Sequence, residues 1–320
     1  MNKIITHLFR INDWKRRHNM WGFKFFGYEL YDVYYNFIIY SIFGWIYESC
    51  YVSVKTGNLV NRGFLNGPII PIYGIGATIV MIVFSPFKNQ VFFIYLGGMI
   101  LATLLEYVTS YLMEKIFHAK WWDYSNFKYN INGRICLLSS LFWGFLSVLM
   151  IEVLKPFSDT LIENIPRNSG EIIAYIILIM ITCDMAVTFI FTMQLDEKLT
   201  ILHKLREEFR EYIVSTKIYE AKEELIGRYT ESQISDIIEK FKNKIEDNLE
   251  RIETLELKEK TEEIYERLKL FTNQYQKILG YKNLIHLRIL KAFPNFKVMN
   301  KEGALKDLKA RLHIKIRRKK

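Results

Sequence analysis

The chain has few cysteines. Only three occur among its 320 residues, Cys50, Cys136 and Cys183, and their spacings are unrelated. Local zinc sites need closely spaced Cys or His pairs, and small disulfide-stapled domains need a denser cysteine framework. The sequence therefore gives no basis for either, and we expect no bound metal. The three cysteines are expected to pack as small apolar side chains inside membrane spans.

Common nucleotide and hydrolase motifs are also missing. No Gly-x-x-x-x-Gly-Lys-Ser/Thr segment occurs, so hydrolysis of a nucleotide through a P-loop is not expected. No Gly-x-Ser-x-Gly elbow occurs either. We assign no catalytic residue and no cofactor. A cleavable signal is not expected, because the first apolar run follows a stretch with Trp14-Lys15-Arg16-Arg17 and leads to no small-residue cleavage site.

Apolar residues, by contrast, are abundant and make up 50% of the chain. Residues 33–195 carry long apolar runs, whereas residues 196–320 are dense in Lys and Glu. A helix that crosses a membrane needs about 20 mostly apolar residues. Five segments are candidates: 34–54, 69–86, 91–113, 135–154 and 172–194. The predicted fold class is all-α, a polytopic helical bundle of about five spans in the cell membrane.

Three further segments flank these spans. Residues 1–32 form a basic, aromatic arm whose composition is typical of an interfacial helix. Residues 196–280 repeat apolar side chains at spacings of three, four and seven, which predicts a cytoplasmic helical hairpin or coiled coil. Residues 281–320 form a basic C-terminal tail, for which anionic lipid is a better partner beside a membrane than nucleic acid.

The distribution of Lys and Arg predicts the orientation. With five spans, the loops at 55–67 and 114–134 lie on the same side of the membrane as the tail. These loops carry more basic residues than the loops of the opposite side, six (Lys55, Arg62, Lys115, Lys120, Lys128, Arg134) against three (Lys88, Lys155, Arg167). Cytoplasmic loops carry an excess of Lys and Arg. The tail is therefore predicted to be cytoplasmic, although the basic arm then lies outside and conflicts with the rule.

Glu48, Glu106 and Asp184 are acids that fall inside predicted spans. A carboxylate at the bilayer centre costs at least about 2.5 kcal/mol, so such groups must face protein or water. Arg62 and Arg134 flank the same cytoplasmic mouth and are the expected counter-charges. The alternatives are a functional site and a structural ion pair that orients helices. Intramembrane acids favour the first, and Asp184 is also compatible with a protonated, merely packed side chain.

Two polar, glycine-bearing loops border this mouth, at 61–68 and 121–134. Pro68 and Pro71 predict either a re-entrant start of the second span or a plain loop with a proline at the start of the helix. The aromatic residues of the second loop either stack on a ligand or form an interfacial belt. The loops and adjoining helix ends supply the remaining candidates for substrate binding: Glu114, His118, Trp121, Trp122, Asp123 and Tyr124. No second histidine lies near His118, which argues against a metal site there.

Several short motifs occur here in a characteristic order: Gly44-Trp45-Ile46-Tyr47-Glu48, Asn61-Arg62-Gly63-Phe64-Leu65, Gly67-Pro68, Pro71-Ile72-Tyr73-Gly74, Glu106-Tyr107-Val108-Thr109-Ser110, Trp121-Trp122-Asp123-Tyr124-Ser125 and Asn132-Gly133-Arg134. As a set they resemble the ABC-transporter type IV membrane family of CmpB-like proteins. The resemblance covers roughly residues 34–195. It implies a multi-pass bacterial membrane protein and, through the family's name, a role in transport.

Three classes of function remain open. A permease-like subunit would need a separate ATPase and a second copy of itself, and would bind an anionic or zwitterionic substrate through Glu48, Arg62, Glu106 and Arg134. A lipid-binding or lipid-modifying enzyme would hold a headgroup in the same place, with Glu114, His118 and Asp123 as acid/base candidates. A membrane scaffold would act through its helical tail.

Overall fold

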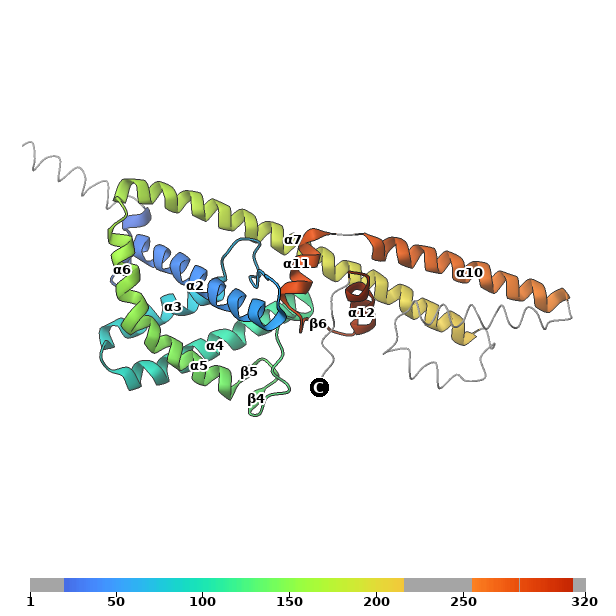
Figure 1. Ribbon diagram of the computed structural model, residues 1–320, viewed down its shortest axis with the longest axis horizontal. Helices are drawn as coiled ribbons and strands as arrows, with labels where there is room; N and C mark the ends of the chain where they lie inside the picture. Colours follow the sequence, from blue (N-terminus) through green and yellow to red (C-terminus); the bar gives the residue numbers. More distant parts are fainter. Residues whose placement is uncertain (1–19, 216–254, 282, 313–320) are drawn as a thin grey trace, which may run out of the picture. The chain divides into compact units, whose positions relative to one another are not determined.

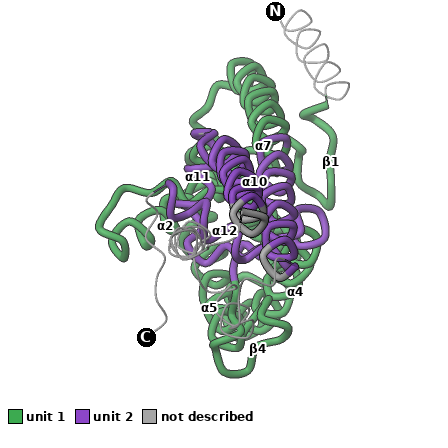
Figure 2. Tube along the Cα trace, turned by 90° about the vertical axis from the view of Figure 1, so that its right-hand side faces the viewer, with its two compact units in different colours: residues 1–112, 123–189 green, residues 113–122, 190–320 purple. Residues whose placement is uncertain are grey.

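A computed structural model describes residues 20–215, 255–281 and 283–312, and its helices and strands are shown in Figure 1. The chain divides into two compact units, coloured separately in Figure 2. Unit 1 comprises residues 1–112 and 123–189, and unit 2 comprises residues 113–122 and 190–320. The predicted cytoplasmic hairpin and basic tail extend partly over 216–254 and 313–320, which lie outside the described residues, as does most of the basic arm.

Unit 1 is built from the helices that the apolar runs predict. They are α2 (Leu30–Thr56), α3 (Pro71–Phe84) with the short η2 (Ser85–Phe87), α4 (Val91–Phe117), α5 (Leu137–Leu149) with the π-helical η3 (Met150–Leu154) and α6 (Lys155–Glu163), and α7 (Arg167–Ser215). The last residues of α4 and the second half of α7 belong to unit 2. The prediction of an all-α helical membrane bundle is confirmed.

Four of the described helical stretches are long and apolar enough to cross a membrane: Leu30–Thr56, Val91–Phe117, Leu137–Glu163 and Arg167–Tyr212. The second predicted span is shorter. Helix α3 has 14 residues, about 21 Å at 1.5 Å per residue, against about 30 Å for the hydrocarbon core. Pro71 stands in the first turn of α3, where its missing N–H costs nothing. Of the two alternatives for this segment, the structure therefore has the plain loop with a proline at the start of the helix.

Helices α2 and α3 approach closely. A Cβ atom on Gly44 would lie 2.3 Å from Cγ of Tyr73, so only glycine admits the Tyr73 ring at this crossing. A buried apolar cluster joins the same two helices to α4 and η3. It includes Tyr40, Met81, Ile94 and Ile151. The close crossing places the Tyr73 hydroxyl beside Glu48, whose surroundings are described below.

The described end of the N-terminal arm packs on unit 1. Residues 20–22 form a 3-10 turn, η1 (Met20–Gly22), and β1 (Lys24–Phe25) pairs with β2 (Tyr28–Glu29) as a hairpin rather than as the interfacial helix that the composition favours. Trp21 is 1% exposed, and its ring lies 5.1 Å from the rings of both Tyr34 and Tyr175. The aromatic residues of this segment thus serve in part as core.

Unit 2 is helical and folds around the second half of α7. Helix α10 (Leu255–Gly280) packs beside it, with the Phe209 and Phe271 rings stacked at 4.7 Å. Helices α11 (Leu284–Ala292) and α12 (Glu302–Arg311) follow, and β3 (Ala119–Lys120) pairs with β6 (Lys297–Val298). At its centre Asp307 accepts hydrogen bonds from Arg206 at 2.8 Å and from Tyr275 at 2.6 Å. Residues 284–311, predicted as a basic tail, are therefore a packed part of this unit.

We expect α11 to lose stability in acid. Burial lowers the pKa of His286. The positive charge of Lys198 lowers this pKa further, and the hydrogen bond with the carbonyl of Phe191 only partly offsets the two effects. The unfolded chain then binds more protons than the folded one below a pH of about 6.5, so stability is present above that pH and is lost as pH falls. Amide hydrogen exchange in α11 should be faster at acid than at neutral pH after correction for the intrinsic rate. His286→Gln keeps a donor but does not titrate, and an equal acid effect in it would contradict this account.

Candidate functional site

The loop at 57–70 is held against α2 by side chains one turn apart. Trp45 Nε1 donates to Asn61 Oδ1 at 2.8 Å. Ser49 Oγ accepts from the backbone N–H of Arg62 at 3.2 Å, and Ser53 Oγ accepts from that of Val60 at 3.0 Å. Residues four apart share one face of a helix. This polar stripe therefore lines up with the loop and fixes the backbone that carries Arg62.

Asp184 anchors the far end of the same loop from α7. Its carboxylate accepts from the backbone N–H groups of Asn66 at 3.1 Å and Gly67 at 2.8 Å, and from the Asn66 side chain at 2.7 Å. Thr188, one turn further along α7, also bonds the Asn66 side chain. The Thr188 hydroxyl also donates to Asp184, at 3.2 Å, so four donors reach this acid. The structure thus gives Asp184, a candidate ligand from the sequence, a positioning role in the loop.

Glu48 lies between the loop and α3. Its Oε1 accepts from the Tyr73 hydroxyl at 2.9 Å, and its Oε2 lies 3.7 Å from Nε of Arg62. The Arg62 side chain is 18% exposed. Burial lowers the pKa of Arg62 while the Glu48 carboxylate acts in the opposite direction. The expected pairing of Glu48 with Arg62 is therefore present, in a largely buried setting where ion pairs are strongly coupled.

Glu106 is held by a different set of groups. The residue is 5% exposed. Its Oε1 accepts from the Tyr124 hydroxyl at 3.1 Å, and its Oε2 accepts from Nε1 of Trp143 at 2.9 Å and lies 3.4 Å from the Ser139 hydroxyl. All three neighbours are neutral. Burial raises the pKa of Tyr124, and the adjacent Glu106 raises it further, so this hydroxyl stays protonated and donates.

The second loop folds into a hairpin that carries Tyr124. Strands β4 (Asn130–Ile131) and β5 (Ile135–Cys136) pair across the turn. Gly133 has φ +68, and a Cβ there would lie 2.5 Å from Oγ of Ser125, so the turn requires glycine. The backbone N–H of Tyr124 donates to the carbonyl of Gly133 at 2.8 Å. Asp123 accepts from the backbone and hydroxyl of Ser125, and its carboxylate therefore stabilises the loop.

Arg134, expected as a counter-charge at the mouth, lies beside two tyrosine rings of α4. Its guanidinium lies over the rings of Tyr107 and Tyr111, at 5.6 and 5.4 Å from their centroids. These two tyrosines are one and five residues beyond Glu106 on α4, on a different face of the helix. The hairpin thus brings Arg134 to the neighbouring face of α4.

The other sequence candidates belong to unit 2, namely Glu114, His118, Trp121 and Trp122. Trp121 is 2% exposed, and its ring packs at 4.8 Å from that of Phe293 and at 5.3 Å from that of Phe296. It is a core residue of that unit. His118 Nδ1 lies 3.3 Å from Oδ2 of Asp196.

Two residues of the site escaped the sequence argument, Tyr73 and Trp143. Tyr73 stands in the quoted Pro71-Ile72-Tyr73-Gly74 motif, but nothing in the motif says that its hydroxyl faces an acid on another helix. Trp143 is at the centre of a stripe, Ser139, Trp143 and Ser147, that repeats every four residues in an apolar helix. That polar face of α5 is the signal that could have identified it.

Metal chemistry finds no support in the part of the chain that the structure describes. No group of three His, Cys, Asp or Glu side chains there is arranged to hold an ion. The three cysteines are free thiols, Cys136 buried and Cys50 and Cys183 exposed on their helices.

The fold defines a class of protein. Large apolar side chains are exposed along α4 and α7, among them Phe92, Ile100, Ile179 and Met180, and apolar surface of this extent on helices of this length is covered by a lipid bilayer. The chain is a helical membrane protein.

Comparison with known families agrees. Residues 35–189 match the model of the family described as "Putative ABC-transporter type IV". This region, which contains most of unit 1, is a member of that family, and the resemblance carried by the motifs is confirmed. The chain matches no curated protein and no solved structure.

Asp184→Ala should release the loop that carries Arg62. Hydrogen bonds to a charged group contribute about 1.5–3 kcal/mol each, so loss of even one such bond should speed amide exchange at residues 60–67 by about tenfold or more. The matched control is Thr182→Val, two residues away on α7, whose hydroxyl bonds only the carbonyl of Leu178. Unchanged exchange in Asp184→Ala would remove the positioning role.

Proposed function

We propose that this chain is the membrane-embedded, permease-like subunit of a transporter, with its substrate site at the cluster of Glu48, Arg62, Glu106, Tyr73 and Tyr124. One observation carries the proposal. Two loops separated by more than fifty residues, together with α2, α3, α4 and α5, bring a buried carboxylate, a partly buried one and a largely buried guanidinium to one end of the bundle. Ionisable groups inside membrane spans mark substrate and ion pathways.

The proposed orientation puts this end of the bundle, and the C-terminal tail, in the cytoplasm. All five helices of the family region then cross the membrane, and the short α3 does so while packed against α2. The surplus of Lys and Arg on the 55–67 and 114–134 loops supports this arrangement. A substrate would reach Arg62 and Glu48 from the loops.

The family's description supports an energy-coupling partner. The chain has no P-loop, so ATP-driven transport by this subunit requires a separate ATPase. Five short helices enclose little space, and we propose that two copies of the chain assemble with it. In this scheme the folded elements of unit 2 offer the ATPase a protein surface on the cytoplasmic side.

Purification in a mild neutral detergent tests the proposal. We expect an ATPase to be enriched with the full-length chain from its native membrane, in a fixed stoichiometry by quantitative proteomics. Glu106→Gln should keep the ATPase, because Glu106 is buried in unit 1, but abolish transport in proteoliposomes that contain the complex. A sample with no enriched ATPase, but with a stoichiometric lipid that is lost in Arg62→Ala, would contradict the permease proposal and favour lipid binding.

A further inference from the structure

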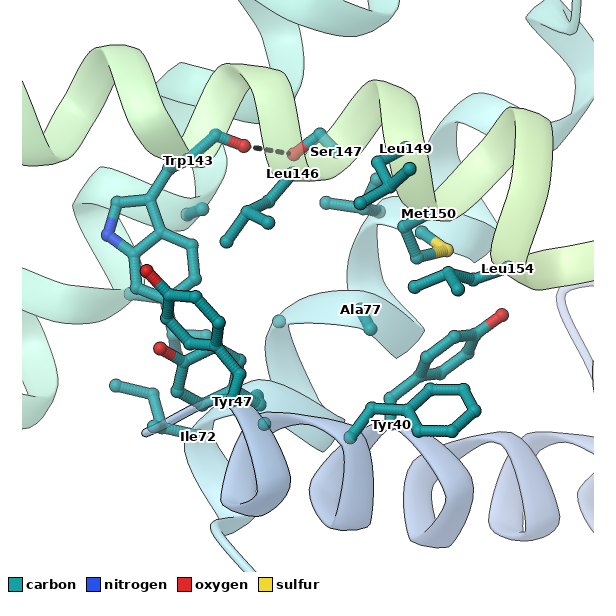
Figure 3. Close-up of a pocket in the computed structure, with 17 residues that line it drawn as sticks. Tyr40, Tyr47, Ile72, Ala77, Trp143, Leu146, Ser147, Leu149, Met150 and Leu154 are labelled. Atoms are coloured by element: carbon teal, nitrogen blue, oxygen red, sulfur yellow. Dashed lines mark hydrogen bonds between the residues drawn. The ribbon is translucent and has the colours of Figure 1, made fainter. Parts of the chain in front are cut away.

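An apolar cavity of about 200 Å³ lies inside unit 1 beside the acid cluster. Residues of α2 face residues of α5 and η3 across it, and α3 and α4 complete its walls (Figure 3). Trp143, Tyr47 and Ile72 lie at one end, and Tyr40, Met150 and Leu154 at the other. An apolar cavity of about 150 Å³ can bind benzene, so this one has room for a short apolar chain.

The walls of this cavity are unusually aromatic. Tyr40, Phe43, Tyr47, Tyr73 and Trp143 all line it, and the Tyr73 and Trp143 rings lie 5.3 Å apart. Aromatic faces carry negative charge density and attract ammonium groups, with Trp the most effective. Ligand pockets that combine apolar walls with a few placed polar groups are the usual sites for small molecules. The lining therefore suits an apolar ligand that carries a positive charge.

Two of these rings are shared with the acid cluster. Tyr73 lines the cavity and donates its hydroxyl to Glu48 at 2.9 Å. Trp143 lines the cavity and donates Nε1–H to Glu106 at 2.9 Å. Each acid therefore lies at the polar edge of one ring of the wall. A cation against the face of either ring is attracted by the ring and by the carboxylate beyond its edge.

The charges of the cluster do not balance within the described part of unit 1. Glu48 forms an ion pair with Arg62. Glu106 meets only the neutral Tyr124, Ser139 and Trp143 among the described residues. An indole N–H can only donate, so Trp143 offers Glu106 a hydrogen bond and no charge. Burial opposes the charge on this carboxyl group, and a positive ligand group in this region would stabilise it.

We propose that the cavity binds the apolar chain of an organic cation, whose ammonium group lies against the Tyr73 and Trp143 rings in front of Glu48 and Glu106. The proposal rests on the function proposed above, because it names the substrate class of that site. It replaces the anionic or zwitterionic substrate that the sequence suggests, since Arg134 lies over tyrosine rings and Arg62 is paired with Glu48.

The ligand has a route from the lipid. Tyr47 lines the cavity and is also 44% exposed at the outer surface of the bundle. Its ring stacks with that of Phe142 on α5 at 5.8 Å. Tyr47 therefore marks a place where the wall of the cavity reaches the outer surface of the bundle. A ligand could enter there from the acyl chains, where amphiphilic cations are concentrated.

Titration calorimetry on the purified full-length chain in a neutral maltoside detergent tests the proposal with three probes of equal chain length. Hexyltrimethylammonium should bind in a saturable manner, whereas hexanol and hexanoate should bind at least about tenfold more weakly. Glu106→Gln should weaken binding of the cation by about tenfold or more and leave binding of hexanol unchanged. Hexanoate binding as tightly as the cation, or Glu106→Gln binding the cation as the wild type does, would overturn the proposal.

Matched variants separate the site from general effects. Ala77→Leu fills the cavity and should abolish binding, whereas Ala186→Leu on the exposed face of α7 should not. Glu152→Gln removes a charge further along the helix that carries Trp143, where Glu152 bonds Asn89, and should bind as the wild type does. Thermal unfolding identifies variants that fail to fold. If the purified protein binds the cation but no ATPase is enriched with it, the transport proposal is contradicted and the cation-binding site is still supported.

Discussion

Carboxylates within apolar helices are the constraint on which the rest of unit 1 depends. Helices that cross a bilayer satisfy their own backbones but give an acidic side chain no water, so each acid must find its partners inside the protein. The three acids meet this requirement in different ways. Glu48 uses a guanidinium and a phenol, Glu106 uses neutral donors, and Asp184 uses the amide groups of a loop. The two loops are shaped largely by these requirements.

The same requirement links structure with function. Aromatic residues that satisfy the acids at their polar ends also present their rings to the apolar cavity. One layer of side chains, Tyr73 and Trp143, therefore separates a charged compartment from an apolar one. A ligand with both a positive charge and an apolar alkyl chain can contact the acids and the cavity at once, whereas a purely polar solute contacts only the acids. Asp184 anchors the loop that carries Arg62 and so positions the charged side of the site, although it lies outside that site.

The sequence predicts the helices well because long apolar runs leave few alternatives. All five predicted spans correspond to helices, and Pro71 correctly marks the start of α3. The site is only partly predictable. The pairing of Glu48 with Arg62 follows from their position at the same end of the bundle. The partner of Asp184 is 117 residues away in the chain, and the placement of Arg134 depends on a hairpin whose register no span pattern encodes.

The roles of the aromatic residues were also hard to predict, because some of them are buried by residues that lie far away in the sequence. Trp121 was expected at a ligand or an interface, but its environment is made by Phe293 and Phe296, which lie far along the chain in unit 2. Trp143, in an otherwise apolar helix, gives no hint of its polar role unless the spacing of Ser139 and Ser147 is considered. Side-chain chemistry predicts what a residue can do, and only the fold shows which partner it meets.

The pairing of Glu48 with Arg62 is the interaction that most directly tests this account. A double-mutant cycle with Glu48→Gln and Arg62→Met, read from unfolding of the full-length protein in lipid bilayers, isolates the coupling between the two side chains. The account predicts a coupling of about 1–3 kcal/mol. The double variant should therefore lose less free energy of unfolding than the two single variants lose when their effects are added. Strictly additive effects would show that the two charges do not share a site, and the cluster would lose its central contact.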